Sequence, residues 1–209
     1  MNIGIILPTR GQERKRFLNQ ALFYIKRQTL QPKYVQVIDE EPKSDANDIT
    51  YRYQKGYEHL KNKCDVIFCF EDDDFYSKNY IESMIAEYKI LSSPDIFGIN
   101  HTTYYHIKTN RWTKLIHPGR ASTMSTVLKG GLNIDWQHDQ RYFIDIHLWK
   151  TLKGIAINMP TINIGIKHGE GKCAGKGHNE NFPYKNYDAD SSFLKSIVGD
   201  DFKFYKPSL

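Results

Sequence analysis

The sequence predicts an α/β protein whose central sheet is mostly parallel and flanked by helices. Two patterns favour this class. Strand-like and helix-like segments alternate through the first 91 residues, and short aromatic and β-branched runs follow in the second half. The chain has 209 residues, 40% of them hydrophobic and 25% charged, which suits a compact protein with one core and argues against a disordered chain.

The first half contains three pairs of a strand and a helix. The expected order is strand, helix, strand, helix, strand, helix at residues 2–7, 13–28, 34–38, 46–61, 65–70 and 79–91. Each strand is a short apolar run rich in β-branched or aromatic residues, and each helix repeats its apolar residues at helical spacing. Pro8 ends the first strand, Pro32 follows the first helix, and Ser44 and Asp45 offer caps for the second helix.

The second half predicts further strands, a helix and a tail. The expected elements are strands and loops at 96–107 and 112–128, a helix at 139–153, two short strands within 155–166 and a short helix at 189–198. Gly154 ends the longer helix, and the strands form a small antiparallel extension of the sheet. We expect one domain over residues 1–178 and a tail over 179–209 whose helix packs on the domain or forms a flap.

Polar residues follow each of the first three predicted strands. Residues 8–10 follow the first strand, Asp39 follows the second, and the acidic run 71–74 follows the third. Ligands of parallel α/β sheets bind outside the carboxyl ends of the strands. We therefore expect these three segments to lie together at one edge of the sheet, although they are far apart in the sequence.

The acidic run Glu71, Asp72, Asp73 and Asp74 is the sharpest chemical feature. Four adjacent carboxylates beside a low-dielectric sheet repel one another, so a compensating cation is expected. A divalent metal such as Mn²⁺ or Mg²⁺, carrying a nucleotide diphosphate, would supply that charge. The alternative is a solvated acidic turn that caps the helix near Ser77. The position at the carboxyl end of a strand favours the metal site.

Asp145 is a candidate general base. On its predicted helix it lines up with Leu148 and Trp149, which places the carboxylate on the apolar face. Partial desolvation should raise its pKa, which suits a group that takes a proton from a hydroxyl. A helix N-terminal acid paired with Arg141 or His147 is an equally good interpretation of the same residues.

His168 follows the last predicted strand of the sheet directly. A histidine at a strand end can complete a metal shell, and Lys172 and Lys176 nearby can neutralise phosphate. The alternative is an ordinary surface loop.

The order of these segments resembles that of the family 2 glycosyltransferases of the GT-A fold, whose central sheet is Rossmann-like. Pro8-Thr9-Arg10 resembles the end of the family's first strand, and the run that ends at Asp39 resembles the strand whose terminal Asp recognises the uracil or other base of the donor. Arg52 falls where the family often has an Arg that contacts the nucleotide. The resemblance implies that all five residues belong to the donor site.

The acidic run resembles the family's D-x-D motif, with Glu71 in place of the usual first Asp. The resemblance implies that Asp73 is the direct metal ligand, and that Glu71 and Asp72 lie beside the ribose and a metal-bound water. His168 resembles the His of the segment that closes the metal and diphosphate site, which adds His168 to the metal ligands and Lys172 to the donor-binding residues.

Residues 143–148 resemble the acidic helix start that carries the family's catalytic base, which implies that role for Asp145. His147 stands where relatives often have a second acid. Asp139 is therefore the reserve candidate for the base.

The expected function is metal-dependent, inverting transfer of a sugar from a nucleotide-sugar donor, with a UDP-sugar favoured, to an acceptor hydroxyl. A glycan or a hydroxymethylated DNA base is the expected acceptor, because aromatic and cationic side chains in the middle of the chain suit sugar rings and nucleic acid alike. These side chains are Tyr104, Tyr105, Arg111, Trp112, Lys114 and Arg120.

Two other classes of function are open. A non-catalytic nucleic-acid-binding module would explain the formal charge of +5 but not the carboxylates at a strand end. A nucleotidyltransferase would use the same carboxylates for two-metal chemistry, but it requires a phosphate loop rich in Gly and Lys, which residues 8–12 supply poorly.

No apolar run approaches the ~20 residues that cross a bilayer, and residues 1–9 are too short an apolar stretch for a signal peptide. The three cysteines lack C-x-x-C spacing, which favours reduced thiols. We expect a cytoplasmic protein without stable membrane insertion.

Overall fold

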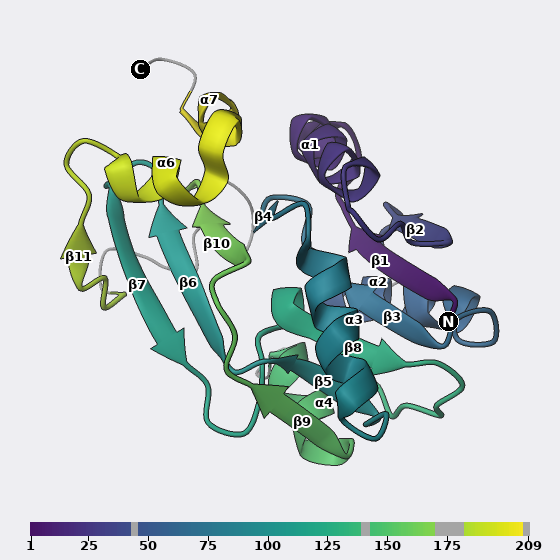
Figure 1. The fold of residues 1–209 in the computed structure, drawn as a ribbon. Helices are drawn as coiled ribbons and strands as arrows, with labels where there is room; N and C mark the ends of the chain where they lie inside the picture. Colours follow the sequence, from purple (N-terminus) through teal and green to yellow (C-terminus); the bar gives the residue numbers. More distant parts are fainter. Residues whose placement is uncertain (43–45, 139–142, 170–181, 207–209) are drawn as a thin grey trace.

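The computed structural model describes residues 1–42, 46–138, 143–169 and 182–206 (Figure 1). Its first half contains β1 (Ile3–Pro8), the 3-10 helix η1 (Gly11–Arg14), α1 (Lys15–Lys26), β2 (Tyr34–Ile38), α2 (Asp48–Leu60), β3 (Val66–Cys69), β4 (Phe75–Tyr76) and α3 (Tyr80–Ile90). Its second half contains β5 (Ile96–Ile99), β6 (His101–His106), β7 (Arg111–Ile116), η2 (Thr123–Ser125), β8 (Thr126–Lys129), α4 (Ile144–Thr151), β9 (Gly154–Ile157), β10 (Asn163–Lys167), β11 (Asn186–Tyr187), α6 (Ser192–Val198), η3 (Gly199–Asp201) and α7 (Phe202–Tyr205).

The first sheet has the strand order β2-β1-β3-β8-β5-β9. β1 is parallel to β2 and β3, and β5 is parallel to β9, whereas β8 is antiparallel to β3 and β5. Among the described strands of this sheet, all but β8 therefore run in the same direction. The predicted α/β class with a mostly parallel sheet is confirmed.

The second sheet has the order β11-β7-β6-β10-β4 and forms the antiparallel extension. Its pairs are antiparallel except for β6 and β10, which are parallel. The chain enters this sheet directly from the first one, since β6 follows β5 and β10 follows β9 (Figure 1). The two sheets are thus joined by continuous stretches of chain rather than by a flexible linker.

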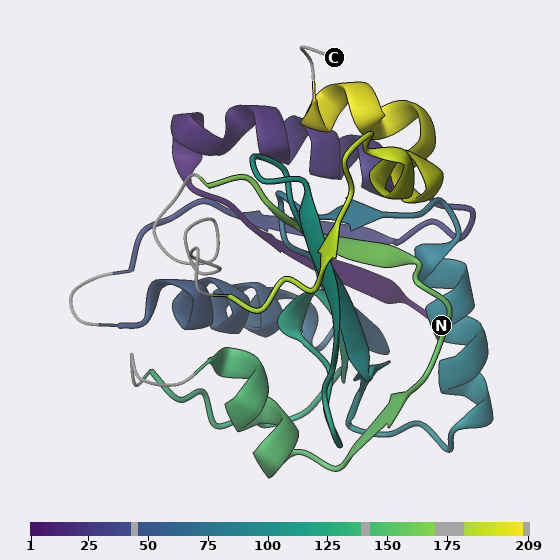
Figure 2. The same ribbon diagram turned by 90° about the vertical axis from the view of Figure 1, so that its left-hand side faces the viewer.

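Helices cover both faces of the first sheet (Figures 1 and 2). Residues of β1 alternate between two core clusters: Ile5 and Leu7 belong to the larger cluster, with α1 and α3, and Ile6 belongs to the smaller one, with α2 and α4. This alternation follows from the two-residue period of a strand, which places successive side chains on opposite faces.

The C-terminal helices α6 and α7 lie beside α1 and the second sheet (Figure 2). Phe193 of α6 stacks on Trp112 with ring centroids 3.7 Å apart. The hydroxyl groups of Tyr205 and Tyr24 are 2.8 Å apart, and a guanidinium nitrogen of Arg27 lies 2.6 Å from a carboxylate oxygen of Asp201. The segment that contains residues 192–205 therefore contributes to the same core.

The predicted elements of the first half match the observed ones to within a few residues. The helix expected at 139–153 is seen as Ile144–Thr151, and residues 139–142 lie outside the described residues. The sequence did not predict β4, β11 or α7. The two strands have two residues each and α7 has four, and segments this short carry no periodicity. None of the helices in the described ranges is long and apolar enough to span a membrane.

Gly56 lets α2 pack directly on β1. A Cβ atom at this position would overlap the side chain of Ile6 in the smaller core cluster. Gly56→Ala should therefore lower the free energy of unfolding by about 1–3 kcal/mol, the usual cost of overpacking, although Ala favours a helix by about 1 kcal/mol over Gly. Urea unfolding measures this change.

Ile6→Ala removes the two nearest atoms that a Cβ at position 56 would meet, Cγ2 and Cγ1 of Ile6, so it provides the control. The double variant Gly56→Ala/Ile6→Ala should lose less stability than the two single variants added together. Additive losses would show that the contact between α2 and β1 is not the reason for glycine.

Candidate functional site

The carboxyl ends of β1, β2 and β3 meet at one edge of the first sheet. The backbone N–H of Thr9 donates to the carbonyl of Ile38 at 2.9 Å, and the N–H of Phe70 donates to the carbonyl of Ile6 at 3.0 Å. Asp39 and Glu71 are the next residues after Ile38 and Phe70. The polar segments that follow the three strands therefore lie together, as the topology of a parallel sheet predicts.

The acidic run forms a buried turn between β3 and β4. Asp72, Asp73 and Asp74 are 6%, 7% and 1% exposed, and Glu71 is half-buried. The Glu71 N–H donates to the Tyr76 hydroxyl at 2.8 Å, which closes the turn. A solvated turn that caps the next helix does not fit this arrangement, because three of the carboxylates are buried and α3 begins only at Tyr80.

Oxygen atoms of Glu71, Asp73 and Asp74 lie within 4.8 Å of one another. Asp74 Oδ1 accepts the N–H of Ile166 at 2.8 Å, whereas Asp74 Oδ2 is buried without a hydrogen-bond partner among the described residues. A buried, unpaired carboxylate oxygen is costly unless a cation meets it. This all-oxygen cluster therefore fits a hard divalent cation such as Mg²⁺ or Mn²⁺.

The oxygen cluster contains Glu71, Asp73 and Asp74, whereas the expected metal ligands were Asp73 and His168. Asp74 had no assigned role, and Glu71 was expected beside the donor. His168, an expected ligand, donates from Nε2 to Asp73 Oδ2 at 2.9 Å, and its ring centroid lies 4.5 Å from that of Phe17. The structure thus places His168 against the Asp73 carboxylate.

Two cations that are not among the expected site residues supply positive charge to the acidic run. Arg14 Nη2 lies 2.9 Å from Asp73 Oδ2 and also contacts Asp72. Lys167, at the end of β10, is only 3% exposed, and its ammonium group lies 5.1 Å from the ring centroid of Tyr104. The sequence did contain a signal for Lys167, because this lysine ends the buried strand Asn163–Lys167. A buried lysine needs a carboxylate as its partner, and the acidic run is the nearby candidate.

The pKa values of these groups reflect burial and mutual charge. Burial raises the pKa of Glu71 to about 7, although Lys167 opposes the shift, and burial also raises the pKa of Asp74 well above its ordinary value. Burial acts on Asp73 in the same sense, but the hydrogen bond with His168 and the charge of Arg14 hold the pKa of Asp73 below its ordinary value. Asp73 is therefore the carboxylate that most strongly stays ionised.

Arg52 holds the ends of β1 and β2 together. It is 2% exposed, and its Nη1 donates to the carbonyls of Thr9 at 2.6 Å and Ile38 at 3.2 Å. Its Nε donates to Asp48, whose other oxygen accepts from Arg10 Nε, both at 2.7 Å. Arg52 thus contacts the backbone of the expected donor site from inside the protein. Asp39, another expected donor-site residue, is exposed to solvent.

Asp145 lies in the first turn of α4 and is 9% exposed. Burial raises its pKa, as expected, and the guanidinium of Arg120, which forms an ion pair with it, opposes that shift. The charge of Asp145 also contributes to raising the pKa values of Glu71 and Tyr104. The sequence missed Arg120 as a partner.

The partners expected for Asp145 differ from the observed one. His147 Nε2 is instead 2.9 Å from the carbonyl oxygen of Asp135, and Arg141 lies outside the described residues. Asp139 and Lys172, the reserve base and a donor-binding candidate, also lie outside them.

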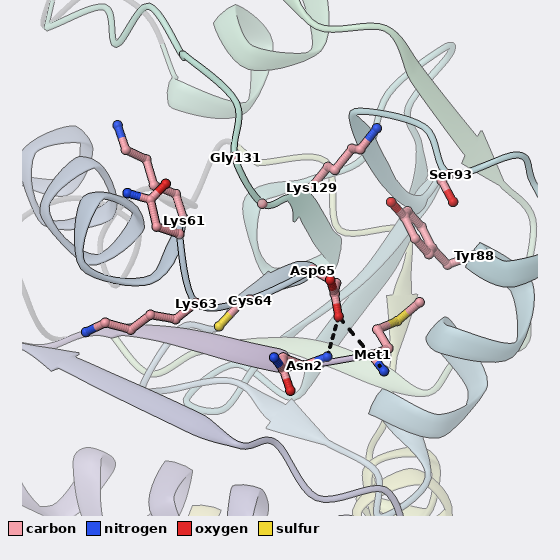
Figure 3. Close-up of a pocket in the computed structure, with 12 residues that line it drawn as sticks. Met1, Asn2, Lys61, Lys63, Cys64, Asp65, Tyr88, Ser93, Lys129 and Gly131 are labelled. Carbon is pink, nitrogen blue, oxygen red and sulfur yellow. Dashed lines mark hydrogen bonds and ion pairs between the residues drawn. The ribbon is translucent and has the colours of Figure 1, made fainter.

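A separate cavity of about 540 Å³ lies at the opposite edge of the sheet (Figure 3). It is lined by residues before β1 and β3 and after β8, including Asp65, Lys61, Lys63 and Lys129. The amino groups of these lysines point away from one another, so they do not converge on a common ligand. The acidic run at the carboxyl edge is the stronger candidate site.

Fold and site together define an α/β protein with an acidic cluster at the carboxyl edge of its mostly parallel sheet. Among solved structures, S. aureus TarS matches with a TM-score of 0.53 and 11% identity over 79% of this chain and 37% of that chain. TarS 1-349 matches with a TM-score of 0.51 and 10% identity over 80% of this chain and 61% of that one. This chain thus spans less than two thirds of either TarS chain, and the likeness supports the fold.

No family model and no curated protein matches the sequence.

Lys167→Met should destabilise the fold by leaving buried carboxylates without their cation. We expect a loss of about 3–5 kcal/mol at pH 8, the usual cost of removing one partner of a buried charge pair. The loss should be smaller at pH 5. Carboxylates whose folded-state pKa lies above the unfolded value, such as Glu71, take up protons preferentially in the folded state as pH falls, which favours folding.

Urea unfolding at the two pH values without divalent cations measures these losses. Lys150→Met, at an exposed position of α4, is the matched control and should change stability little. Equal losses at pH 5 and pH 8 for the Lys167 variant would contradict the role of Lys167 as a counter-charge.

Proposed function

We propose that the protein is a metal-dependent, inverting glycosyltransferase that uses a nucleotide-sugar donor, with UDP-sugars favoured. The observation that carries this proposal is the oxygen cluster of Glu71, Asp73 and Asp74 at the carboxyl edge of a GT-A type sheet, the same edge at which Asp39 follows β2. Similarity in fold to S. aureus TarS supports the same class.

The residues at the strand ends would bind the donor. Asp39, exposed after β2, can accept hydrogen bonds from the nucleotide base, and Thr9 and Arg10 follow Pro8 at the neighbouring strand end. Arg52 would act indirectly, by holding the carbonyls of Thr9 and Ile38. Lys172 stays a candidate for the phosphates.

Asp73, Glu71 and Asp74 would hold Mn²⁺ or Mg²⁺, with His168 beside Asp73. When bound, the metal would stabilise negative charge on the departing diphosphate. Asp73 suits the direct ligand because its carboxylate oxygen lies within the oxygen cluster of Glu71, Asp73 and Asp74.

Asp145 would take the proton from the acceptor hydroxyl. Its position at the start of α4 is partly desolvated, which keeps its pKa above that of a free Asp, and Arg120 holds the carboxylate in place. Asp139 stays the reserve candidate. The expected acceptor is a glycan or a hydroxymethylated DNA base.

The aromatic side chains of the middle segment favour an enzyme over a nucleic-acid-binding module. Tyr105 is fully buried, and Phe193 stacks on one face of the half-buried Trp112, so neither ring has both faces free to stack on bases. Arg120, one of the basic residues of that segment, forms an ion pair with Asp145.

Metal-dependent nucleotide binding tests the donor and metal assignment. UDP should raise the thermal stability of the protein in the presence of Mn²⁺ and much less without it, by about 2.7 kcal/mol when UDP is present at 100 times its Kd. Asp73→Asn should lose the Mn²⁺-dependent part. Asp65→Asn, at the opposite edge of the sheet, is the control and should keep it.

Stabilisation by oligonucleotides alone would contradict the proposal and favour the binding module. Equal UDP and Mn²⁺ binding by Asp73→Asn and the wild type would show that the metal site is elsewhere.

Asp145→Asn tests the base. It should bind UDP and Mn²⁺ as the wild type does, and it should slow sugar release from UDP-sugars by roughly 10²–10⁴-fold, the range that general base catalysis supplies. A chromatographic assay of UDP release over a panel of UDP-sugars measures this rate. Undiminished release would exclude Asp145 and direct the same test to Asp139.

A further inference from the structure

The carboxylate of Asp72 is fully engaged by protein groups. Asp72 Oδ2 accepts the Thr9 hydroxyl at 2.8 Å and Arg14 Nε at 3.2 Å, while Asp72 Oδ1 accepts from Arg14 Nη2. The guanidinium therefore meets both oxygens of Asp72 in the two-pronged geometry that binds carboxylates best. A carboxylate held in this way is poorly placed to bind a ribose.

Arg14 is held at the boundary between Asp72 and Asp73. It ends η1, directly after the loop that follows β1, and its guanidinium carbon lies 4.8 Å from the ring centroid of Phe17. Nη2 also reaches Asp73 Oδ2 at 2.9 Å. Among the described residues, no hydrogen-bond partner of Arg14 Nη1 is found.

The charges of the site leave room for both Arg14 and a divalent cation. The four carboxylates of residues 71–74 carry four formal negative charges, and Arg14 and Lys167 supply two positive ones. A divalent cation on Asp73 can leave the paired contact of Arg14 with Asp72 intact, because Arg14 contacts Asp73 at Oδ2. Arg14 would then remain beside the metal, with an N–H group directed to the ligand.

We propose that Arg14 binds the diphosphate of the donor and that Asp72 positions Arg14 instead of contacting the donor. This inference rests on the proposed function, because it requires a nucleoside diphosphate at the acidic cluster. A guanidinium suits this task, since its planar N–H groups bind phosphate oxygens as a fork. Asp72 and Phe17 restrict its rotation before the ligand arrives, which reduces the entropy lost on binding.

Calorimetric titration with UDP and with inorganic pyrophosphate in the presence of Mn²⁺ tests the proposal. Uridine is the third probe, and its binding is measured by ligand-observed NMR with Mg²⁺ in place of the paramagnetic Mn²⁺. Arg14→Gln should weaken binding of UDP and pyrophosphate on the order of tenfold to a hundredfold, the strength of hydrogen bonds to charged groups. Uridine binding should stay unchanged, because uridine has no phosphate.

Asp72→Asn should weaken the same two probes by a smaller factor. The double variant should bind no more weakly than Arg14→Gln alone, because Asp72 acts only through Arg14. Arg14→Lys keeps the charge but loses the fork, and it should lie between the wild type and Arg14→Gln. Thermal unfolding of each variant without metal checks the fold, and Arg14→Lys carries the test if Arg14→Gln does not fold. Lys15→Gln removes one exposed charge from the next residue and should bind all probes normally.

Three results would overturn the inference. Pyrophosphate binding by the Arg14 variants at the wild-type Kd would show that Arg14 only neutralises the acidic run. An equal loss of uridine and UDP binding in Asp72→Asn would place Asp72 on the nucleoside. Failure of the wild-type protein to bind either UDP or pyrophosphate with Mn²⁺ would reject the proposed function, and the inference with it.

Discussion

Compensation of buried negative charge is the constraint on which the site depends. Asp72, Asp73 and Asp74 lie in a turn with little access to water, where each ionised carboxylate costs several kcal/mol unless cations and N–H groups meet it. Arg14 comes from the segment after β1 and Lys167 from the end of β10. Two segments far apart in the sequence therefore supply the positive charge that compensates the turn.

The site lies where the two sheets approach each other. The first sheet supplies Asp39 and the acidic turn at the ends of its parallel strands, and the second supplies Lys167 and His168 through β10. β4, directly after the acidic turn, pairs with β10 and joins the turn to the second sheet. A ligand at the acidic cluster would therefore lie beside both sheets. The two-residue strand β4 is important for this arrangement, because its pairing with β10 brings the acidic turn to the second sheet.

The local patterns predicted the fold better than the site. Periodicity and strand ends placed the acidic run and Asp39 at one edge, and the apolar neighbours of Asp145 predicted its burial and raised pKa. The partner of Asp145 was not predictable, because Arg120 belongs to a loop with no pattern of its own. Tyr105 and Trp112 resembled ligand-stacking groups in sequence, but Tyr105 is buried and the half-buried Trp112 stacks on Phe193, since apolar rings serve a core as well as a ligand.

By itself, the sequence determined the α/β class, the order of its elements and the position of four carboxylates after a strand, because each depends on residues close along the chain. Only the tertiary structure decided which charges meet. Thr9 and Asp72 are 63 positions apart, and Asp73 and His168 are 95 apart. Contacts over such separations depend on how strands pair and helices pack. For that reason, the pairing of Arg14 with Asp72 and the unpaired oxygen of Asp74 emerged only from the folded chain.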